Sequence, residues 1–309
     1  MCRFSIVIPV YNNPAIDRCL YSVLNQTYND FELIVINDGS DDSTLDIINS
    51  VIKNDERAKV LSFENGGLAT ARNRGIDASS GEYIWMIDSD DYIEHNALEM
   101  LNRFIEQHGS DLIMIDYYVV DEQQHELNNA YLKTDLKELP ETGTVNDLLV
   151  AYLDRKIHSY AWAYVAKRRM YKNIKYPDGK NYEDLRTTYK VFQNVNKMGV
   201  FKHKVYYYVQ TQNSITHTIN EKNILDFYEA GKEMCSKLEN DKSLNRKAKM
   251  FYVGIVVNSY FNMYKINKAK AYPFKLEFRN YMKQNSLYIY LFLRSNYFFK
   301  IVLLSLWPL

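Results

Sequence analysis

The sequence predicts an α/β fold with a mostly parallel central sheet flanked by helices, followed by an α-helical C-terminal region. Three observations support this prediction. Continuous apolar, β-branched runs such as Phe4–Val10 and Phe31–Ile36 are typical of strands buried on both faces of a parallel sheet. Segments with apolar residues at helical spacing separate these runs, as in βαβ units with right-handed crossovers. From about Asn220 onward the pattern is helical.

Strands and helices are expected to alternate along the first two thirds of the chain. Apolar runs predict further strands at residues 60–63, 83–87, 112–118 and 200–209. Helical spacing predicts helices within residues 16–24, 45–52, 68–79, 98–105, 145–152 and 185–192. Residues 121–142 are polar and are expected to form a surface loop or lid. Residues 161–166 are expected to be extended, and Pro177-Asp178-Gly179 predicts a turn.

The composition excludes several classes of protein. The 309 residues contain 38 Lys or Arg and 38 Asp or Glu, so no global field favours nucleic acid as a partner. Cys2, Cys19 and Cys235 are scattered, which argues against a disulfide framework or a zinc site and favours a reducing compartment. The stretch Met1–Pro9 is too short and too strand-like for a signal peptide.

The C-terminal region is basic and apolar. Residues 265–309 hold eight Lys or Arg against one acid, Glu277, a net charge of +7. The apolar end, Leu287–Leu309, is broken by Arg294 and Lys300, and it lacks the uncharged run of ~20 residues that spans a bilayer. It is expected to lie on anionic lipid as an interfacial helix. The alternatives are a helix packed on the preceding domain or on a dimer partner.

One acidic stretch indicates a candidate metal-binding site. The apolar run 83–87 ends in Asp88-Ser89-Asp90-Asp91, and Asp88 and Asp90 both reach the crevice beyond a strand end. Such paired carboxylates can hold a divalent cation, because hard cations prefer oxygen ligands. The alternative is a polar turn in which Asp91 or Ser89 caps the next helix.

Two further loops are expected to meet this one at the same crevice, namely Pro9–Asn13 and Asp38–Asp42. The helix starting near Leu68 adds backbone N–H groups and Arg72, which suit a pyrophosphate. Neither a Gly-x-Gly-x-x-Gly after the first strand nor a Gly-Lys-Ser/Thr loop occurs, which weakens dinucleotide and ATPase interpretations. A metal-bridged nucleoside diphosphate with a uracil-sized base near Pro9, Tyr11 and Asp38 fits better.

Four stretches together resemble the successive motifs of family 2 glycosyltransferases. They are residues 4–13 (FSIVIPVYNN), 35–40 (VINDGS), 71–76 (ARNRGI) and 87–91 (IDSDD). The resemblance covers residues 3–118 densely and thins afterwards. It implies a GT-A fold and an inverting transferase that builds bacterial surface polysaccharide or decorates teichoic acid.

The resemblance also implies roles for individual residues. Pro9, Tyr11 and Asp38 would frame uracil and ribose, and Asn65 would lie on the uracil edge. Arg72 would face the base or the diphosphate.

The acidic stretch would complete the donor site. Asp88 would approach the ribose and the metal, with Ser89 also on the nucleotide-sugar side. Asp90 would be the principal Mn²⁺ or Mg²⁺ ligand, and Asp91 would be a helix cap or a supporting group.

An inverting displacement needs a carboxylate base opposite the leaving group. Glu183-Asp184 resembles the family's Glu-Asp pair, with Asp184 as base and Glu183 positioning the acceptor or Asp184. The alternative is that both residues only favour the first turn of a helix.

Two later motifs depart from the family pattern. Trp162 is a candidate stacking platform for an acceptor, but the family's Trp-Asn-Lys-Leu-Tyr reads Trp-Ala-Tyr-Val-Ala here, so Trp162 is equally expected in the core. Residues 212–217 (QNSITH) resemble the family's Gly-Ser-Ile-Thr turn, which makes His217 a candidate third metal ligand or diphosphate contact.

The resulting prediction is an inverting hexosyl- or N-acetylhexosaminyltransferase. It would use a UDP-sugar, Mn²⁺ or Mg²⁺ and a glycan or lipid-linked acceptor for cell-surface polysaccharide, capsule or cell-wall synthesis. Residues 1–217 would form the catalytic domain, with a nucleotide-sugar half (1–118) and an acceptor half (119–217), and 218–309 the helical region. The protein would be cytoplasmic and peripheral on the inner membrane face, and its apolar C-terminal helices would also suit a homodimer. The alternatives are an inactive GT-A-like scaffold and a nucleotidyltransferase.

Overall fold

The computed structural model describes residues 2–127, 134, 136–210, 220–285 and 287. The chain divides into two compact units, Met1–Ser214 and Ile215–Leu309. The boundary predicted after residue 217 falls within 211–219, outside the described residues.

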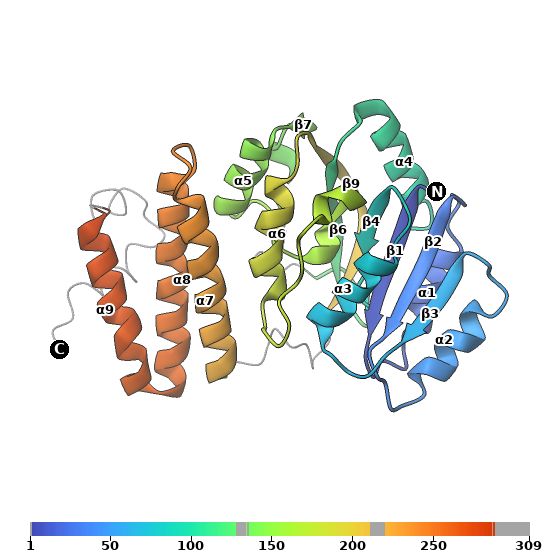
Figure 1. The fold of residues 1–309 in the computed structure, drawn as a ribbon, viewed down its shortest axis with the longest axis horizontal. Helices are drawn as coiled ribbons and strands as arrows, with labels where there is room; N and C mark the ends of the chain where they lie inside the picture. The colour runs from blue at the N-terminus through green and yellow to red at the C-terminus, as the bar shows by residue number, and fades with distance from the viewer. Residues whose placement is uncertain (1, 128–133, 135, 211–219, 286, 288–309) are drawn as a thin grey trace. The chain divides into compact units, whose positions relative to one another are not determined.

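A mixed sheet forms the centre of the first unit (Figure 1). Four parallel strands form one half in the order β3-β2-β1-β4, with bounds Phe4–Val10 (β1), Phe31–Asn37 (β2), Ala58–Ser62 (β3) and Tyr83–Met86 (β4). All side chains of β1 and β4 are buried. These continuous apolar runs therefore form the interior strands that the sequence predicts.

The other half of the sheet is mixed. Strand β8 (Tyr164–Lys167) runs antiparallel to both β4 and β6 (Leu112–Asp121), and β9 (Met198–Gln210) runs parallel to β6. Two short strands, β5 (Tyr92–Ile93) and β7 (Thr142–Gly143), pair antiparallel with β9. The predicted fold class is confirmed. The extended segment predicted at 161–166 corresponds to β8 from Tyr164 onward, whereas Ala161–Ala163 form a short 3₁₀ helix (η2), and the antiparallel place of β8 between β4 and β6 was not predicted.

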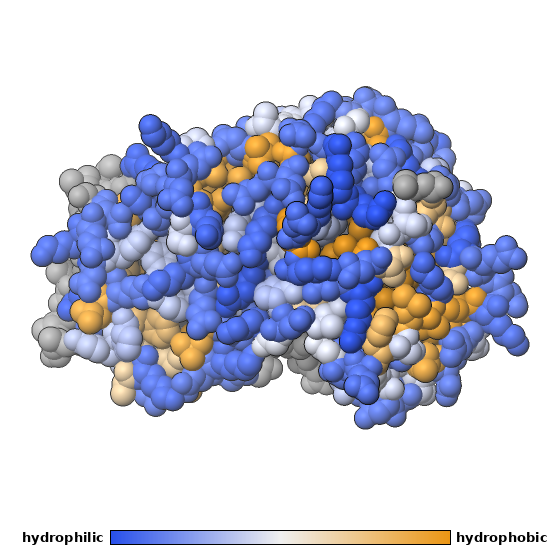
Figure 2. All heavy atoms as spheres, viewed as in Figure 1, coloured by the Kyte–Doolittle hydropathy of each residue, from blue (hydrophilic) through white to orange (hydrophobic). Residues whose placement is uncertain are grey.

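Helices cover the sheet. They are α1 (Asp17–Leu24), α2 (Thr44–Ile52), α3 (Leu68–Ala78), α4 (Ala97–His108), α5 (Val145–Leu153) and α6 (Glu183–Gln193). Figure 1 shows α3 in front of the sheet, where it packs against β1 and β2. In Figure 2 apolar side chains gather over the part of this unit that holds the first strands, where β3 is a half-exposed edge strand.

The polar segment 121–142 is not a surface loop along its whole length. Short helix η1 (Leu136–Glu138) and β7 follow its undescribed part, and Leu136 and Leu139 are buried. The prediction of a loop or lid is therefore wrong for its last residues, because a few apolar side chains in a polar run are enough to pack against β9.

Close packing of α3 predicts a stability effect. Gly75 faces β1, and a Cβ built there would come within 2.2 Å of Val7 Cγ1. Gly75→Ala should lower stability by ~1–3 kcal/mol despite the better helix propensity of Ala, because overpacking forces side chains or backbone to shift. Thermal unfolding followed by circular dichroism measures this, and an unchanged or raised Tm would contradict the packing described here.

The second unit is helical, with α7 (Glu221–Leu238), α8 (Asn245–Ile266) and α9 (Lys268–Gln284). Its core includes Met234, Val253, Phe274 and Phe278. None of the helices that the structure describes combines the length and the apolar content needed to cross a membrane. The predicted interfacial helix, Leu287–Leu309, lies outside the described residues apart from Leu287.

Candidate active site

Three loops meet at the carboxyl ends of β2, β1 and β4. Strand β1 pairs with β2 on one side and β4 on the other, so the chain reverses its direction of travel across the sheet here. Ligands of open α/β sheets bind at such a switch point. Hydrogen bonds connect the loops: Asn13 Nδ2 donates to Ser89 Oγ (3.0 Å), and Asn12 Nδ2 donates to Asp41 Oδ1 (2.7 Å).

The residues predicted to frame a base differ in exposure. Pro9 is buried in β1 opposite Ile36, so it shapes the strand end and presents no open face. Tyr11, directly beyond the strand, is 51% exposed. Of these two residues, only Tyr11 offers a ring to a ligand in this crevice.

Asp38 holds the loop before α3. Its carboxylate is 2% exposed and accepts from the N–H groups of Gly66 and Gly67 and from Arg74 Nη1 (2.8 Å). Asn65, next to these glycines, is exposed. Asp38 therefore organises the loop that would contact a base, and Arg74 is a partner that sequence reasoning missed.

The acidic loop contains three different carboxylates. Asp88 Oδ1 accepts from Arg72 Nη2 at 3.0 Å. Asp90 makes no ion pair with any described residue, but its backbone carbonyl accepts from Arg18 Nη2 at 3.2 Å. Part of its surface is exposed, yet protein surrounds the carboxyl group, and this desolvation together with the charge of Asp88 raises its pKa to about 6, while Arg18 acts to lower it. Asp91 is fully buried and accepts from Tyr206 Oη (2.6 Å) and the Val209 N–H (2.8 Å).

Asp91 is not a helix cap. The chain continues from it into β5, and α4 begins only at Ala97. Asp91 supports the acidic loop through Tyr206, whose hydroxyl group donates to Asp91 and also accepts from the Asp88 N–H at 3.2 Å. Residues of β9 therefore fix the Asp91 carboxylate and the backbone of Asp88 in position.

Trp162 supports this arrangement from inside the core. It is 2% exposed, its ring stacks on Tyr206 at 4.5 Å, and Tyr160 stacks on it at 5.0 Å. Tyrosine rings cover the indole in this structure, so it presents no open face on which an acceptor could stack. The alternative, a core residue, matches this burial.

Glu183 and Asp184 form the first turn of α6. Asp184 Oδ2 accepts from Ser159 Oγ at 3.2 Å, and Oδ1 accepts from the Leu185 N–H at 2.6 Å. Desolvation and then the neighbouring Glu183 charge raise the pKa of Asp184 to about 6, while Arg72 acts to lower it. Asp184 is therefore mostly ionised at neutral pH.

Arg72 joins the two halves of the site. It is 3% exposed, with Asp88 on one side at 3.0 Å and an ion pair to Glu183 on the other. The resemblance had placed it against the base or diphosphate, but its guanidinium fork already holds two carboxylates here. The Arg72 side chain therefore bridges the loop after β4 and the first turn of α6.

The chain leading into α6 is fixed to α3 by contacts that sequence reasoning missed. Asn73 exchanges two hydrogen bonds with the Tyr176 backbone (2.8 and 2.9 Å), and Thr70 Oγ1 donates to Asp178 Oδ1 (2.7 Å). Arg72 also lies over the Tyr176 ring at 5.6 Å. The polar residues Thr70, Arg72 and Asn73 lie close together on α3, which could have indicated a contact surface on this helix. The sequence does not show what they contact, because these partners lie more than 100 residues later.

A divalent cation fits part of this site. Within the described part of the chain, no group of three or more His, Cys, Asp or Glu side chains is placed to hold a metal ion. Asp90 is nonetheless a hard oxygen donor without a cationic partner there, with Asp88 two residues away, and a bound diphosphate would supply further oxygens. His217 lies outside the described residues.

The mostly parallel mixed sheet flanked by helices, with its crevice at the switch point, is a fold of the GT-A type. The model of Glycosyl transferase family 2 matches residues 5–170, more than half of the chain, and the chain belongs to this family. The resemblance stated from the four motifs is confirmed.

Relatives and a solved structure agree with this assignment. Glycosyltransferase GlyA of Streptococcus pneumoniae is 29% identical over 248 residues, covering 77% of this chain and 35% of that protein. The uncharacterized glycosyltransferase EpsJ of Bacillus subtilis is 31% identical over 219 residues, 69% of this chain and 62% of that protein. The crystal structure of S. aureus TarS 1–349 in complex with UDP-GlcNAc superimposes with a TM-score of 0.68 at 23% identity, covering 89% of this chain and 75% of that one.

The Arg72 bridge predicts a pH effect. Arg72 lowers the pKa of Asp184, so Arg72→Gln should raise that pKa above about 6 and move the acid limb of the pH–rate profile to higher pH. Arg72→Lys keeps the charge but loses the double contact, and should lower kcat with a smaller pH shift. Circular dichroism controls for folding; an unchanged acid limb in a folded Arg72→Gln protein would contradict the prediction.

Proposed function

We propose that this protein transfers a hexose or N-acetylhexosamine from a UDP-sugar to a hydroxyl group of a glycan or lipid-linked acceptor. The reaction serves the synthesis of cell-surface polysaccharide and inverts the anomeric carbon. The observation that carries the proposal is the Arg72 bridge, which sets the acidic loop beside the Glu183–Asp184 pair. The likeness in fold to TarS, solved in complex with UDP-GlcNAc, supports a uridine nucleotide.

Each residue then has a distinct task. Asp184 accepts the proton of the acceptor hydroxyl as its oxygen bonds to the anomeric carbon and the bond to the UDP oxygen breaks. Glu183, paired with Arg72, keeps the first turn of α6 in place. Tyr11 and the loop organised by Asp38 hold the base. Asp90 and Asp88 would hold Mn²⁺ or Mg²⁺, which would supply positive charge to the leaving diphosphate.

The test is release of UDP from a panel of UDP-sugars in Mn²⁺, in Mg²⁺ and in chelator. Metal-dependent UDP from one or a few sugars supports the proposal. Pyrophosphate released from UTP and a sugar 1-phosphate, with no UDP from any UDP-sugar, would indicate a nucleotidyltransferase. Nucleotide binding by calorimetry with no release from any sugar would favour the scaffold alternative.

We also propose that the protein works at the inner face of the membrane through its second unit. The exposed Tyr264, Ile266, Tyr272 and Leu276 lie on α8 and α9 among lysines, a combination that suits an anionic bilayer surface. Co-sedimentation of residues 1–309 with vesicles of phosphatidylglycerol, but not of phosphatidylcholine alone, is the expected result. Homodimers in place of vesicle binding would support the alternative of a protein partner.

A further inference from the structure

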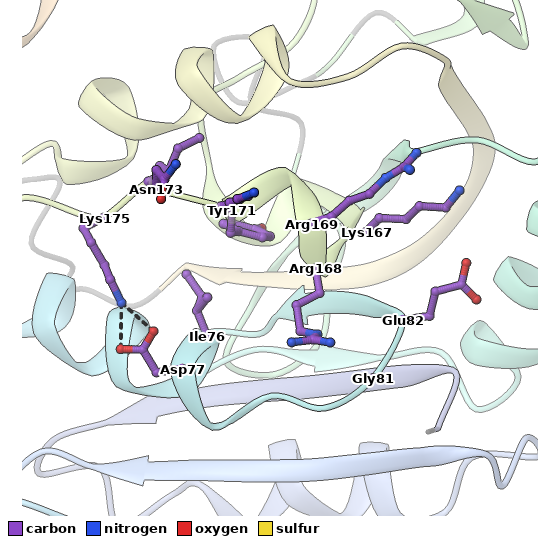
Figure 3. Close-up of a pocket in the computed structure, with 12 residues that line it drawn as sticks. Ile76, Asp77, Gly81, Glu82, Lys167, Arg168, Arg169, Tyr171, Asn173 and Lys175 are labelled. Atoms are coloured by element: carbon purple, nitrogen blue, oxygen red, sulfur yellow. Dashed lines mark hydrogen bonds and ion pairs between the residues drawn. The ribbon is translucent and has the colours of Figure 1, made fainter.

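A basic recess lies in the first unit, away from the crevice described above. Its volume is about 650 Å³. It is enclosed by the end of α3, the turn before β4 and the segment after β8 (Figure 3). Five lining side chains are cations: Lys167, Arg168, Arg169, Lys172 and Lys175.

The recess holds more positive charge than its own acids neutralise. Its two carboxylates are already paired, Asp77 with Lys175 at 2.5 Å and Glu82 with Arg3. Lys167 and Arg169 share Asp111, at 3.1 and 2.5 Å. Both cations contact Oδ1, and the other oxygen of that carboxylate, Oδ2, accepts from the N–H groups of Asn196 and Lys197.

Two of the five cations have no acidic partner among the described residues. The side chains of Arg168 and Lys172 are exposed and make no ion pair or hydrogen bond within the part of the chain that the structure describes. Figure 3 shows Arg168 between Glu82 and the Lys175–Asp77 pair. A guanidinium without an acceptor at the centre of a concave, cationic surface is suited to a bidentate anion.

The sequence concentrates charge at this place. Residues 155–177 contain seven Lys or Arg and no Asp or Glu, whereas the whole chain has 38 of each sign. Like charges so close together repel one another, and the repulsion is relieved when an anion binds among them.

The recess is separate from the candidate active site. Lys167 is paired with Tyr83, the first residue of β4, whereas the acidic loop follows Met86 at the other end of that strand. In α3, Arg72 lies on the active-site side, and Ile76 and Asp77 line the recess one turn or more later. The donor diphosphate therefore does not account for this charge.

We propose that this recess binds a phosphate group, as a monoester or diester, with Arg168 as its principal contact and Lys172 as the second. Arg168 matches two phosphate oxygens with its planar fork, and Lys172 supplies a point charge. The group belongs to a soluble or polymeric phosphate ester or to a phospholipid headgroup. In either case it anchors a second molecule at a distance from the transfer reaction.

The test uses the full chain and two probes. Calorimetric titration with inorganic phosphate measures the soluble form, and co-sedimentation with phosphatidylglycerol vesicles measures the headgroup. Arg168→Glu/Lys172→Glu is compared with Lys53→Glu/Lys137→Glu, which makes the same change in net charge at exposed positions elsewhere in the first unit. The recess variant should weaken binding about tenfold or more, since two charge-assisted contacts are lost, and the control should not.

The two probes assign the source. Phosphate binding that is lost in the recess variant assigns a soluble ester, and vesicle binding lost in that variant assigns a headgroup. Binding of neither probe by the wild type, binding that the recess variant keeps in full, or equal loss in the recess and control variants would overturn the proposal. Circular dichroism and UDP release of the recess variant, which carries no change in the candidate active site, confirm that its loss is not unfolding.

Discussion

Asp184→Asn is expected to reduce acceptor-dependent kcat by ~10²–10⁴-fold, the usual contribution of a positioned general base. The amide keeps the shape of the side chain: its oxygen can still accept from the Leu185 N–H, and its nitrogen can donate to the Ser159 hydroxyl oxygen in place of accepting from it. It cannot take up the proton of the acceptor hydroxyl. Binding of UDP by calorimetry should change little, because Asp184 contacts α6 and Ser159 and lies across Arg72 from the acidic loop.

The pH profile of the wild type gives a second readout. Since the pKa of Asp184 is raised to about 6, the rate should fall as the pH drops through that value and the base becomes protonated. A matched control is Asp178→Asn, which alters a carboxylate six residues earlier that accepts only from Thr70 among the described contacts. An Asp184→Asn protein with kcat close to that of the control would remove Asp184 from the mechanism.

Asp90→Asn is expected to have the next largest effect, a loss of metal-dependent donor binding. Among the described residues, its carboxylate is the one acid of the 88–91 stretch that forms no ion pair and accepts no side-chain hydrogen bond, although Arg18 lies nearby on its backbone carbonyl. Removing one hard oxygen ligand should weaken UDP binding in Mn²⁺ by ~10-fold or more while leaving the weaker binding in chelator unchanged. Below about pH 6 protons should compete with the metal, because the metal-free pKa of Asp90 is raised to about 6.

Comparing Asp91→Ala with Asp90→Asn distinguishes a role in folding from a role in metal binding. It removes the acceptor for Tyr206 Oη and the Val209 N–H inside the core, so it should lower stability by ~1–3 kcal/mol. Asp90→Asn should leave Tm almost unchanged. If the two variants lost stability and metal dependence to the same extent, the division of roles within the acidic loop would be wrong.

The parallel half of the sheet could be predicted because its signals are local. Strands such as Phe4–Val10 are apolar without interruption, and turn residues end each of them, so the meeting of three loops at one edge follows from the βαβ rule. The four motifs lie in this half, and they identified the family.

The partners of the site residues could not be predicted, because they are set by tertiary packing. Nothing in the sequence near Arg72 shows that Glu183, 111 residues later, reaches its guanidinium. Burial of Trp162 depends on Tyr206 arriving from β9 on one face and Tyr160 on the other. Aromatic residues look alike in sequence whether they stack on a ligand or on each other, and here they stack on each other beneath the acidic loop.

The most direct measurement is proton NMR of the sugar first released when the enzyme slowly hydrolyses an α-linked UDP-sugar without acceptor. Single displacement by water on the face of Asp184 predicts that the β anomer forms first, before mutarotation mixes the anomers. The reaction should require Mn²⁺ or Mg²⁺ and should nearly stop in Asp184→Asn. First release of the α anomer, or hydrolysis of equal rate in chelator, would contradict an inverting, metal-assisted transfer with Asp184 as base.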